Sequence, residues 1–427
     1  MTLSNSKALH EVAVCLETTA FTAETTPGTY ILVEDGSGKI LTPRGVDKYK
    51  SSKYNRPTLS VAKAYLPEVE IKTWGFYTGN FTGELFNAVL GSDTMTTPTG
   101  ASTARLHTMT LGDNLDSYTI WDKTAVTEQA MSGGTCDSLN VSGPQDSPMS
   151  LTAKFFGTEV NTVSTFGTAS YISETALANV IAASHNSITF GVESANITDV
   201  TFDIKNGIKA DEGVTQGYYH PRNIIVGKDR EISGSFDVWD ETGEMLLAYW
   251  DGDTSSPTAT TPNERPSYPS IQCTWTGAEI EATISDASQT TGTGLDDASS
   301  GGTFTGTDGD TYVVTISSTG TPDNFTWTKN GGNTSGPVEI SGTAQTLSDG
   351  VTITFSATTG HTAGDAWTII GYKFNYYLDI NCPSIYIDSI TPSESDNRRK
   401  NTVNWHAVKT SGTPITVTLQ NTDSTQY

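Results

Sequence analysis

Apolar and polar residues alternate over short stretches along most of the chain, which is the pattern of strands with one buried face. The clearest stretches, rich in β-branched and aromatic residues, are 29–33, 187–192 and 352–355. Dipeptides that tolerate positive φ and therefore favour tight turns separate many of them. Examples are Asp35-Gly36, Gly133-Gly134, Asp308-Gly309, Gly331-Gly332 and Asp349-Gly350. The pattern predicts a mainly β, turn-rich protein.

Helical patterns are confined to three short segments. One is the Ala- and Leu-rich segment Ser173–Ser184, and the other two lie around Leu85 and Met245. In the last two, the apolar residues are spaced so that a short helix buries one face. We therefore expect few helices, each of them short.

An internal duplication relates the segments around Leu85 and Met245. Three pairs of segments match in order along the chain: Val33-Glu34 with Val192-Glu193, Val69–Ile71 with Arg230–Ile232, and Gly83–Gly91 with Gly243–Gly252. The offset stays between 159 and 161 residues at all three places. A constant offset across three individually weak matches indicates two copies of one unit.

Further along, the offset increases to about 240, which indicates an insertion of about 80 residues in the second unit. There, Ser138–Val141 is matched with Tyr377–Ile380, and Ser150–Gly157 with Val403–Ala407. Composition places the insertion, because residues 286–369 hold nine acidic residues and a single basic one, among many Thr, Gly and Ser. Its own strand pattern predicts an immunoglobulin-like β module that projects outward from an exposed loop.

These observations predict three domains. The first is residues 1–175, the second combines 176–285 with 371–427, and the third is the insert, 286–370.

Acidic residues outnumber basic ones 48 to 24, which gives a formal net charge of −24. Such a surface argues against binding to nucleic-acid phosphates or to anionic lipid. The chain also has 8 Trp, 17 Tyr and 14 Phe, enough to build buried cores and more than is typical of disordered acidic chains.

No run of about 18 apolar residues is present, and the first 20 residues lack the pattern of a secretory signal, so we expect neither a membrane-spanning helix nor export. The four cysteines are dispersed with no Cys-x-x-Cys pair, which excludes a zinc ribbon and suggests free thiols in a reducing compartment.

Motifs for catalysis or metal binding are missing from the sequence. The six histidines lack metal-ligand spacing, Gly36–Lys39 lacks P-loop spacing, and no Gly-x-Ser-x-Gly elbow occurs. Asp308 and Asp310 resemble the start of a calcium loop, but the remaining ligand positions do not fit. We therefore expect no catalytic residues, no metal and no cofactor.

A family resemblance emerges when the motifs are taken in order. They are Glu24–Thr29, Gly83–Gly91, Ser138–Val141, Phe155–Gly157, Ile232–Val238, Pro383–Ile387 and Pro414–Asn421. Together they resemble the tail tube (major tail) proteins of long-tailed, non-contractile bacteriophages, across residues 8–285 and 371–427. The insert resembles Thr- and Gly-rich β modules of phage structural proteins, through Phe304–Gly306 and Gly360–Asp365.

The resemblance implies two tandem tail-tube-like β-sandwich or barrel domains, each with a short helix. In that family, six such folds form a ring, and the rings stack into a hollow tube through which viral DNA leaves. Two folds per chain would make the ring a homotrimeric pseudo-hexamer.

The implied partners are other copies of the chain, a tape measure protein, and tail tip or terminator proteins. The implied location is the virion tail, after assembly in the host cytoplasm. DNA would pass through the lumen without specific binding, which suits an acidic wall because it repels phosphate. No membrane is involved.

A basic segment stands out against the acidic background. Residues 39–56 carry six basic residues and only Asp47 as an acid: Lys39, Arg44, Lys48, Lys50, Lys53 and Arg56. The Pro, Gly and Ser among them predict a long loop. It is either a solvated surface loop or a clamp that contacts an acidic surface of the neighbouring subunit or ring; the family resemblance raises the second possibility. We expect a second cluster, Arg398-Arg399-Lys400, to form a mixed-charge turn between strands.

An alternative function stays open on the sequence alone. Thr- and Gly-rich β modules with exposed Trp also occur in carbohydrate-binding or adhesive proteins of a tail tip or fibre. On that hypothesis Trp327 in the insert is a candidate surface for stacking a sugar ring.

Overall fold

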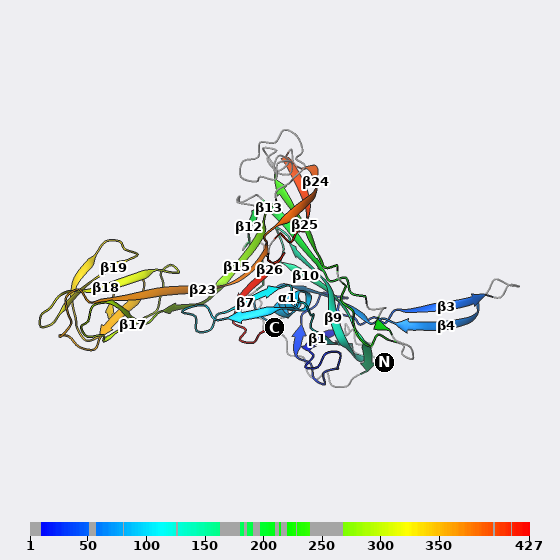
Figure 1. The fold of residues 1–427 in the computed structure, drawn as a ribbon, viewed down its shortest axis with the longest axis horizontal. Coiled ribbons are helices and arrows are strands. Elements are labelled where there is room, and N and C mark those ends of the chain that lie inside the picture. The colour runs from blue at the N-terminus through cyan, green and yellow to red at the C-terminus, as the bar shows by residue number, and fades with distance from the viewer. Residues whose placement is uncertain are drawn as a thin grey trace, which may run out of the picture.

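The computed structural model describes residues 10–50, 57–79, 81–124, 127–162, 180–182, 186–190, 197–209, 213–214, 220–227, 229–239, 268–395, 398–410 and 412–427. The prediction of a mainly β protein is confirmed, since antiparallel sheets packed as sandwiches make up most of these residues (Figure 1). Across the described ranges the sheets stay open and none closes into a barrel.

The helix predicted around Leu85 is present as α1 (Thr82–Leu90), whose apolar face lies in the core. Val180 and Ala182, at the end of the segment predicted as a helix, instead form single β-bridges with Phe76 and Pro148. The remainder of that segment, and the helix predicted around Met245, lie outside the described residues.

One wall of the first half is a run of four strands with a short strand at its edge. The order is β2-β1-β8-β9-β11. The strands are β1 (Glu11–Leu16), β2 (Thr29–Ile31), β8 (Tyr118–Lys123), β9 (Glu128–Gly143) and β11 (Glu159–Thr162).

The second half repeats this arrangement with different strands. Its order is β12-β15-β23-β26, which corresponds to β1-β8-β9-β11. The strands are β12 (Asn186–Phe190), β15 (Ile271–Ile284), β23 (Ala366–Cys382) and β26 (Thr416–Asn421). The strand pairing therefore supports the duplication that the sequence indicates.

The facing wall repeats as well. In the first half β5 (Glu68–Trp74) pairs with β10 (Ser150–Phe156), which pairs with the second part of β9. In the second half β14 (Glu231–Trp239) pairs with β25 (Arg398–Ala407), which pairs with β24 (Ile385–Ser395). The predicted match of residues 150–157 with 403–407 agrees with this pairing.

The predicted match of residues 138–141 with 377–380 is wrong by one strand. Residues 138–141 pair with β10, and the strand that pairs with β25 in the same way is β24. Residues 377–381 pair with β15 and β26, so they correspond to the first part of β9, which pairs with β8 and β11. Two successive segments of one bent strand have similar alternation, and the sequence pattern did not separate them.

The two halves are joined within both walls. Strand β13 (Ile197–Lys205) lies between β9 of the first half and β14 of the second. On the other wall β26 pairs with β7 (Arg105–Thr110), which pairs with β6 (Asp93–Thr96). Buried side chains of both halves form one continuous core. The two halves therefore share a core; the boundary predicted at residue 175 lies outside the described residues, and the domain limits stay a prediction.

Arg230 of the second half binds the end of α1 in the first half. Its guanidinium donates to the carbonyl oxygens of Val89 (2.8 Å), Leu90 (3.1 Å) and Gly112 (2.7 Å). The buried Asn206 accepts from Arg230 Nε at 2.7 Å and donates to the Val89 oxygen at 2.9 Å. A cation is favourable here because the carbonyl end of a helix is negative.

The segment after β26 packs against the other end of the same helix. The Tyr427 ring stacks on buried His107 with 4.3 Å between ring centroids, and its hydroxyl lies 2.6 Å from Asp423 Oδ2. Gly83 makes room for this ring, because a Cβ at that position would lie 2.1 Å from it. Burial raises the pKa of nearby Glu84 to about 7.

The insert lies at the end of a two-stranded stem, formed where residues 279–284 of β15 pair with residues 371–375 of β23 beyond the wall. Strands β15 and β23 pair from Ile271 opposite Cys382 to Ile284 opposite Gly371, and the module begins where this ladder ends. A loop of the first half, at residues 102–104, contacts the stem. Glu281 of the stem accepts hydrogen bonds from the backbone N–H groups of Ser102, Thr103 and Ala104 at 2.7–2.9 Å.

The insert is a small β-sandwich with its own core. One sheet has the order β16-β23-β18-β19-β20 and the other β17-β22-β21. The strands are β16 (Ser288–Thr291), β17 (Ala298–Gly302), β18 (Thr311–Ser318), β19 (Asn324–Lys329), β20 (Ser335–Glu339), β21 (Gln345–Thr346) and β22 (Val351–Phe355). Its buried side chains form a cluster separate from the core of the two halves.

Ion pairs hold the loops of the insert together. His361 lies between Asp297 (2.9 Å from Nε2) and Asp323 (3.0 Å from Nδ1). Lys329, the single basic residue of the insert, contacts Asp310 at 2.7 Å and Asp349 at 2.9 Å.

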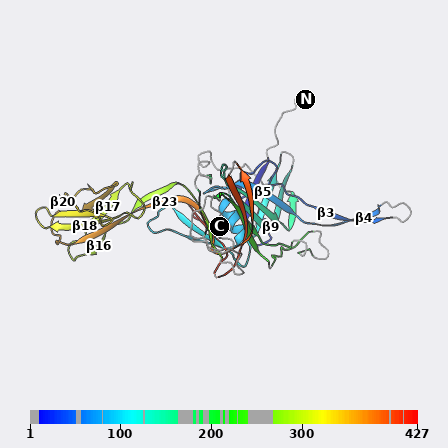
Figure 2. The same cartoon turned by 90° about the horizontal axis from the view of Figure 1, so that it is seen from above.

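Two features project from opposite sides of the body (Figures 1 and 2). One is the insert on its stem. The other is a hairpin of β3 (Arg44–Lys50) and β4 (Pro57–Tyr65), which we call the arm. The long loop predicted over residues 39–56 is thus wrong for 44–50, because cross-strand pairing with residues 57–65 outweighs the local turn preference of Pro and Gly.

Candidate assembly edges

The two halves are joined by strand pairing between β9 of the first half and β13 of the second half. In this join Leu139 lies opposite Ile204 and Val141 opposite Phe202. All four side chains are buried. The join therefore combines a backbone ladder with an apolar contact.

Because the arrangement is duplicated, each of these two strands has a counterpart in the other half. The two counterparts lie at the two outer edges of the wall that contains β9 and β13. The counterpart of β9 is β24, which pairs with β25 on one side only among the described residues. The counterpart of β13, which lies beside β14, is the segment 34–41, which lies beside β5. Gly38 N donates to Glu70 O at 2.6 Å, and Leu41 forms a bridge with Glu68.

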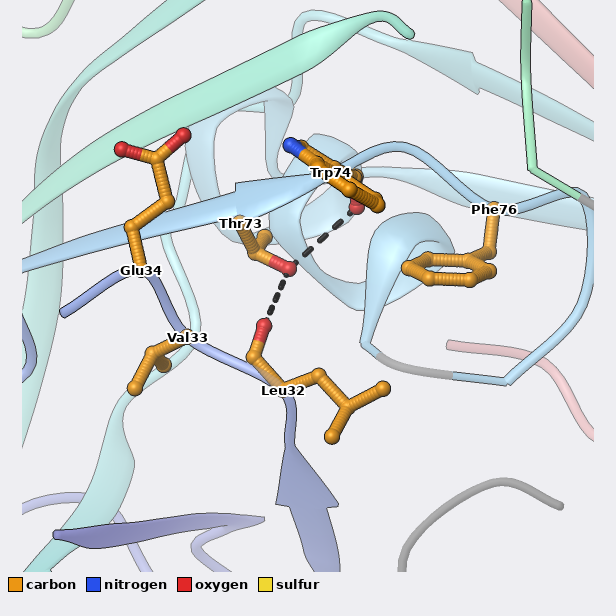
Figure 3. Close-up of a pocket in the computed structure, with 6 residues that line it drawn as sticks. All are labelled: Leu32, Val33, Glu34, Thr73, Trp74 and Phe76. Atoms are coloured by element: carbon orange, nitrogen blue, oxygen red, sulfur yellow. Dashed lines mark hydrogen bonds between the residues drawn. The ribbon is translucent and has the colours of Figure 1, made fainter. Parts of the chain in front are cut away.

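We call the edge at residues 34–41 the first-half edge. An apolar cavity of about 210 Å³ lies where this edge begins, lined by Leu32–Glu34 and by Thr73, Trp74 and Phe76. Figure 3 shows Leu32 and Val33 on one side of it, with Trp74 and Phe76 opposite. Thr73 ties the two sides together, because its hydroxyl donates to Leu32 O at 2.6 Å. Trp74, at one end of β5, is 47% exposed, and Leu41, which bridges Glu68 at the other end of β5, is 55% exposed.

The edge at β24, which we call the second-half edge, also carries exposed aromatic residues. Tyr386 on β24 is 36% exposed and Tyr268 is 45% exposed, with 6.4 Å between their ring centroids. Four of the eight large apolar side chains that are exposed in the described ranges thus lie at these two edges. Apolar surface concentrated at complementary strand edges marks an interaction surface.

The basic residues predicted as a contact site fall at and beyond the first-half edge. Lys39 is exposed within that edge, and Arg44, Lys48 and Lys50 lie on β3 of the arm. Lys53 and Arg56 lie outside the described residues. The structure thus brings four of the six onto one continuous segment that leads from the edge into the arm, and their role stays a prediction.

The second basic cluster, predicted as a turn between strands, instead begins strand β25, because its three residues pair with β24; residues 396–397 lie outside the described residues. Arg398 lies opposite Ser395 and Arg399 opposite Glu394 at the end of the β24–β25 ladder. Lys400 contacts Asp237 at 2.8 Å.

Trp327 lies on β19 of the insert and is half-buried against its core, with its ring centroid 6.3 Å from that of Tyr312. Part of the ring is therefore used for packing. Its predicted role as a sugar platform stays a prediction.

No protein family model matches the chain, and no curated protein matches it in sequence. Within the described ranges, no group of three His, Cys, Asp or Glu residues is arranged to hold a metal ion. No helix in the described parts of the chain is long and apolar enough to cross a bilayer.

The edges were missed at the level of sequence, although one signal was present. Along β5 the residues alternate between buried and less buried positions, and Trp74 falls on the exposed face. A Trp in a polar position of an alternating strand is the feature that would have identified this edge.

Proposed function

We propose that this protein is a structural subunit that assembles with copies of itself into rings, and that the rings stack as the tail tube of a long-tailed phage. The observation that carries the proposal is the β9–β13 join. Among the described residues, the counterparts of these two strands each have a neighbouring strand on one side only, at the first-half edge and at the second-half edge.

In the proposed contact, two copies pair with each other in the same way as β9 and β13 pair within one chain. The second-half edge of one copy pairs with the first-half edge of the next and covers the cavity beside Trp74. Because the two surfaces differ, the interface is heterologous, and its repetition produces either a closed ring or a filament. The family resemblance favours a closed ring of six halves, which is three copies.

The arm supports stacking of such rings. A two-stranded hairpin is at most marginally stable alone in water, so an extended arm is expected to rest on another surface. The basic residues of segment 39–56 complement a chain with a net charge of −24. The same acidic excess suits a conduit that DNA crosses without binding.

The test uses one charge at each edge. We expect Trp74→Lys and Tyr386→Lys each to stop assembly at high protein concentration, because each buries a charge in the apolar contact. The matched control is Leu295→Lys, which changes an exposed apolar residue of the insert, 41% exposed and away from both edges. It should assemble like the unmodified protein in gel filtration and negative-stain electron microscopy.

Mixing the two blocked variants separates this interface from others. Each variant keeps one intact edge, so an equimolar mixture should form a dimer and nothing larger. Assembly by either variant alone, or a mixture that stays monomeric while both variants are folded, would contradict the proposal. Images of the unmodified protein should show rings of three copies, and isolated particles at every concentration would count against it.

A further inference from the structure

A second concave surface lies at the neck, where the stem of the insert meets the body. It encloses about 620 Å³ and is bordered by the insert loop 306–308, by β23 and by the end of β26. This volume falls within the range of about 300–1,000 Å³ that is typical of small-molecule sites. We call it the neck trough.

Backbone contacts fix the wall of the neck trough. Gly309 N donates to Gly371 O, and Gly371 N donates to Asp310 O, both at 2.9 Å. Lys373 N donates to Asp308 Oδ1 at 2.8 Å. The Phe304 ring lies directly over Gly371, where a Cβ would be 2.3 Å from it. The site is therefore formed before any ligand arrives, which reduces the entropic cost of binding.

The lining combines neutral and charged polar groups with an aromatic ring. Its polar side chains come from three separate segments: Thr307, Asp308, Lys373, Asn375, Tyr377 and Gln420. Gln420 donates its amide to Asn375 O at 2.7 Å, so its amide oxygen is the acceptor it offers to a ligand. Lys373 lies 3.4 Å from Glu279, which balances its charge.

This chemistry fits a ligand with many hydroxyl groups and no large net charge. A carboxylate accepts hydrogen bonds from hydroxyl groups, and amide and hydroxyl side chains both donate to them and accept from them. The face of an aromatic ring such as Tyr377 provides apolar contact for the C–H side of a sugar.

We propose that the neck trough binds a short saccharide. The site is separate from Trp327, which lies on β19 within the insert. The proposal does not depend on ring assembly, because every lining residue belongs to one chain.

Binding to the full chain is measured by saturation-transfer NMR and calorimetric titration. The three probes are maltotriose, chitotriose and 3′-sialyllactose. We expect one of them to bind, and Asn375→Ala and Asp308→Asn each to weaken it at least tenfold. Asp308→Asn keeps an oxygen that can accept from Lys373 N, so the wall stays in place. The matched controls are Asn333→Ala, an exposed Asn of the same module, and Trp327→Ala.

The outcomes are distinct. Weaker binding in both trough variants, with both controls unchanged, supports the neck trough. Loss of binding in Trp327→Ala with full binding in Asn375→Ala would transfer the site to β19 and overturn the proposal. Absence of transfer from all three probes to the unmodified, folded protein would also overturn it.

Discussion

At the scale of single residues, His361 shows how the insert uses its acidic excess. Its imidazole is buried and bonded on both sides by carboxylates, from Asp297 and Asp323. Burial alone would lower the pKa of His361, but the two hydrogen-bonded carboxylates outweigh it and raise the pKa above the usual 6.5. The protonated form therefore belongs to the folded insert.

This geometry predicts that the insert loses stability as the pH rises. A group whose pKa is higher in the folded state stabilises it fully below the unfolded pKa, near 6.5, and that contribution is lost as the pH rises through the folded value. The melting temperature of the insert transition, followed by calorimetry, should therefore fall above about pH 6.5.

The variant His361→Gln provides the comparison, because it keeps one hydrogen bond and removes the titration. Its melting temperature should be lower near pH 6 and should change less between pH 6 and pH 9. If the melting temperatures of the unmodified protein and of the variant change with pH in parallel, this histidine does not control the stability of the insert.

At the scale of elements, α1 depends on a residue from the other half of the chain. Arg230 donates to three carbonyl groups at or near the helix end, while Asn206 and Gly112 N also bond the carbonyls of Val89 and Leu90. The second half thus supplies hydrogen bonds to the end of a first-half helix.

Replacement of Arg230 by Met should therefore lower the free energy of unfolding by about 1–3 kcal/mol, the cost of leaving a buried acceptor without its donor. Urea unfolding followed by circular dichroism measures the change. Arg105→Met is the matched control, because Arg105 also donates to two carbonyls, those of Ser102 and Ala104, but lies nearer the solvent. A loss no greater than that of the control would contradict a role for Arg230 in joining the halves.

Much of the element order could be predicted from alternation and turn residues. The helix at Leu85 and the β character of the insert followed from local patterns. The arm did not, because residues 44–50 are strand only through pairing with 57–65. The two assembly edges also depend on which strands lie side by side, such as β9 and β13, and local sequence does not contain that information.

At the scale of the whole molecule, the arm extends on the side opposite the insert (Figures 1 and 2). If arms join rings and the sheet edges close them, the two contacts can be weakened separately. We expect the triple variant Lys48→Glu, Lys50→Glu and Lys53→Glu to form rings but few tubes, since the charges that favour stacking are reversed.

Electron microscopy counts both species, and raising the salt concentration should reduce tubes of the unmodified protein because ions screen exposed charges. Thermal unfolding of the triple variant serves as the control for an intact fold. A normal yield of tubes from that variant would remove the basic segment from the stacking contact.

The stem of the insert has a further consequence. Ile284 and Gly371 face each other as paired residues, so the chain leaves the body and returns to it at neighbouring positions. Paired residues of an antiparallel ladder lie about 4.5–5.5 Å apart, a gap that a tight turn can close. The module can thus be exchanged for a turn, or for another domain whose ends lie close together, without a change in the path of the chain through the body.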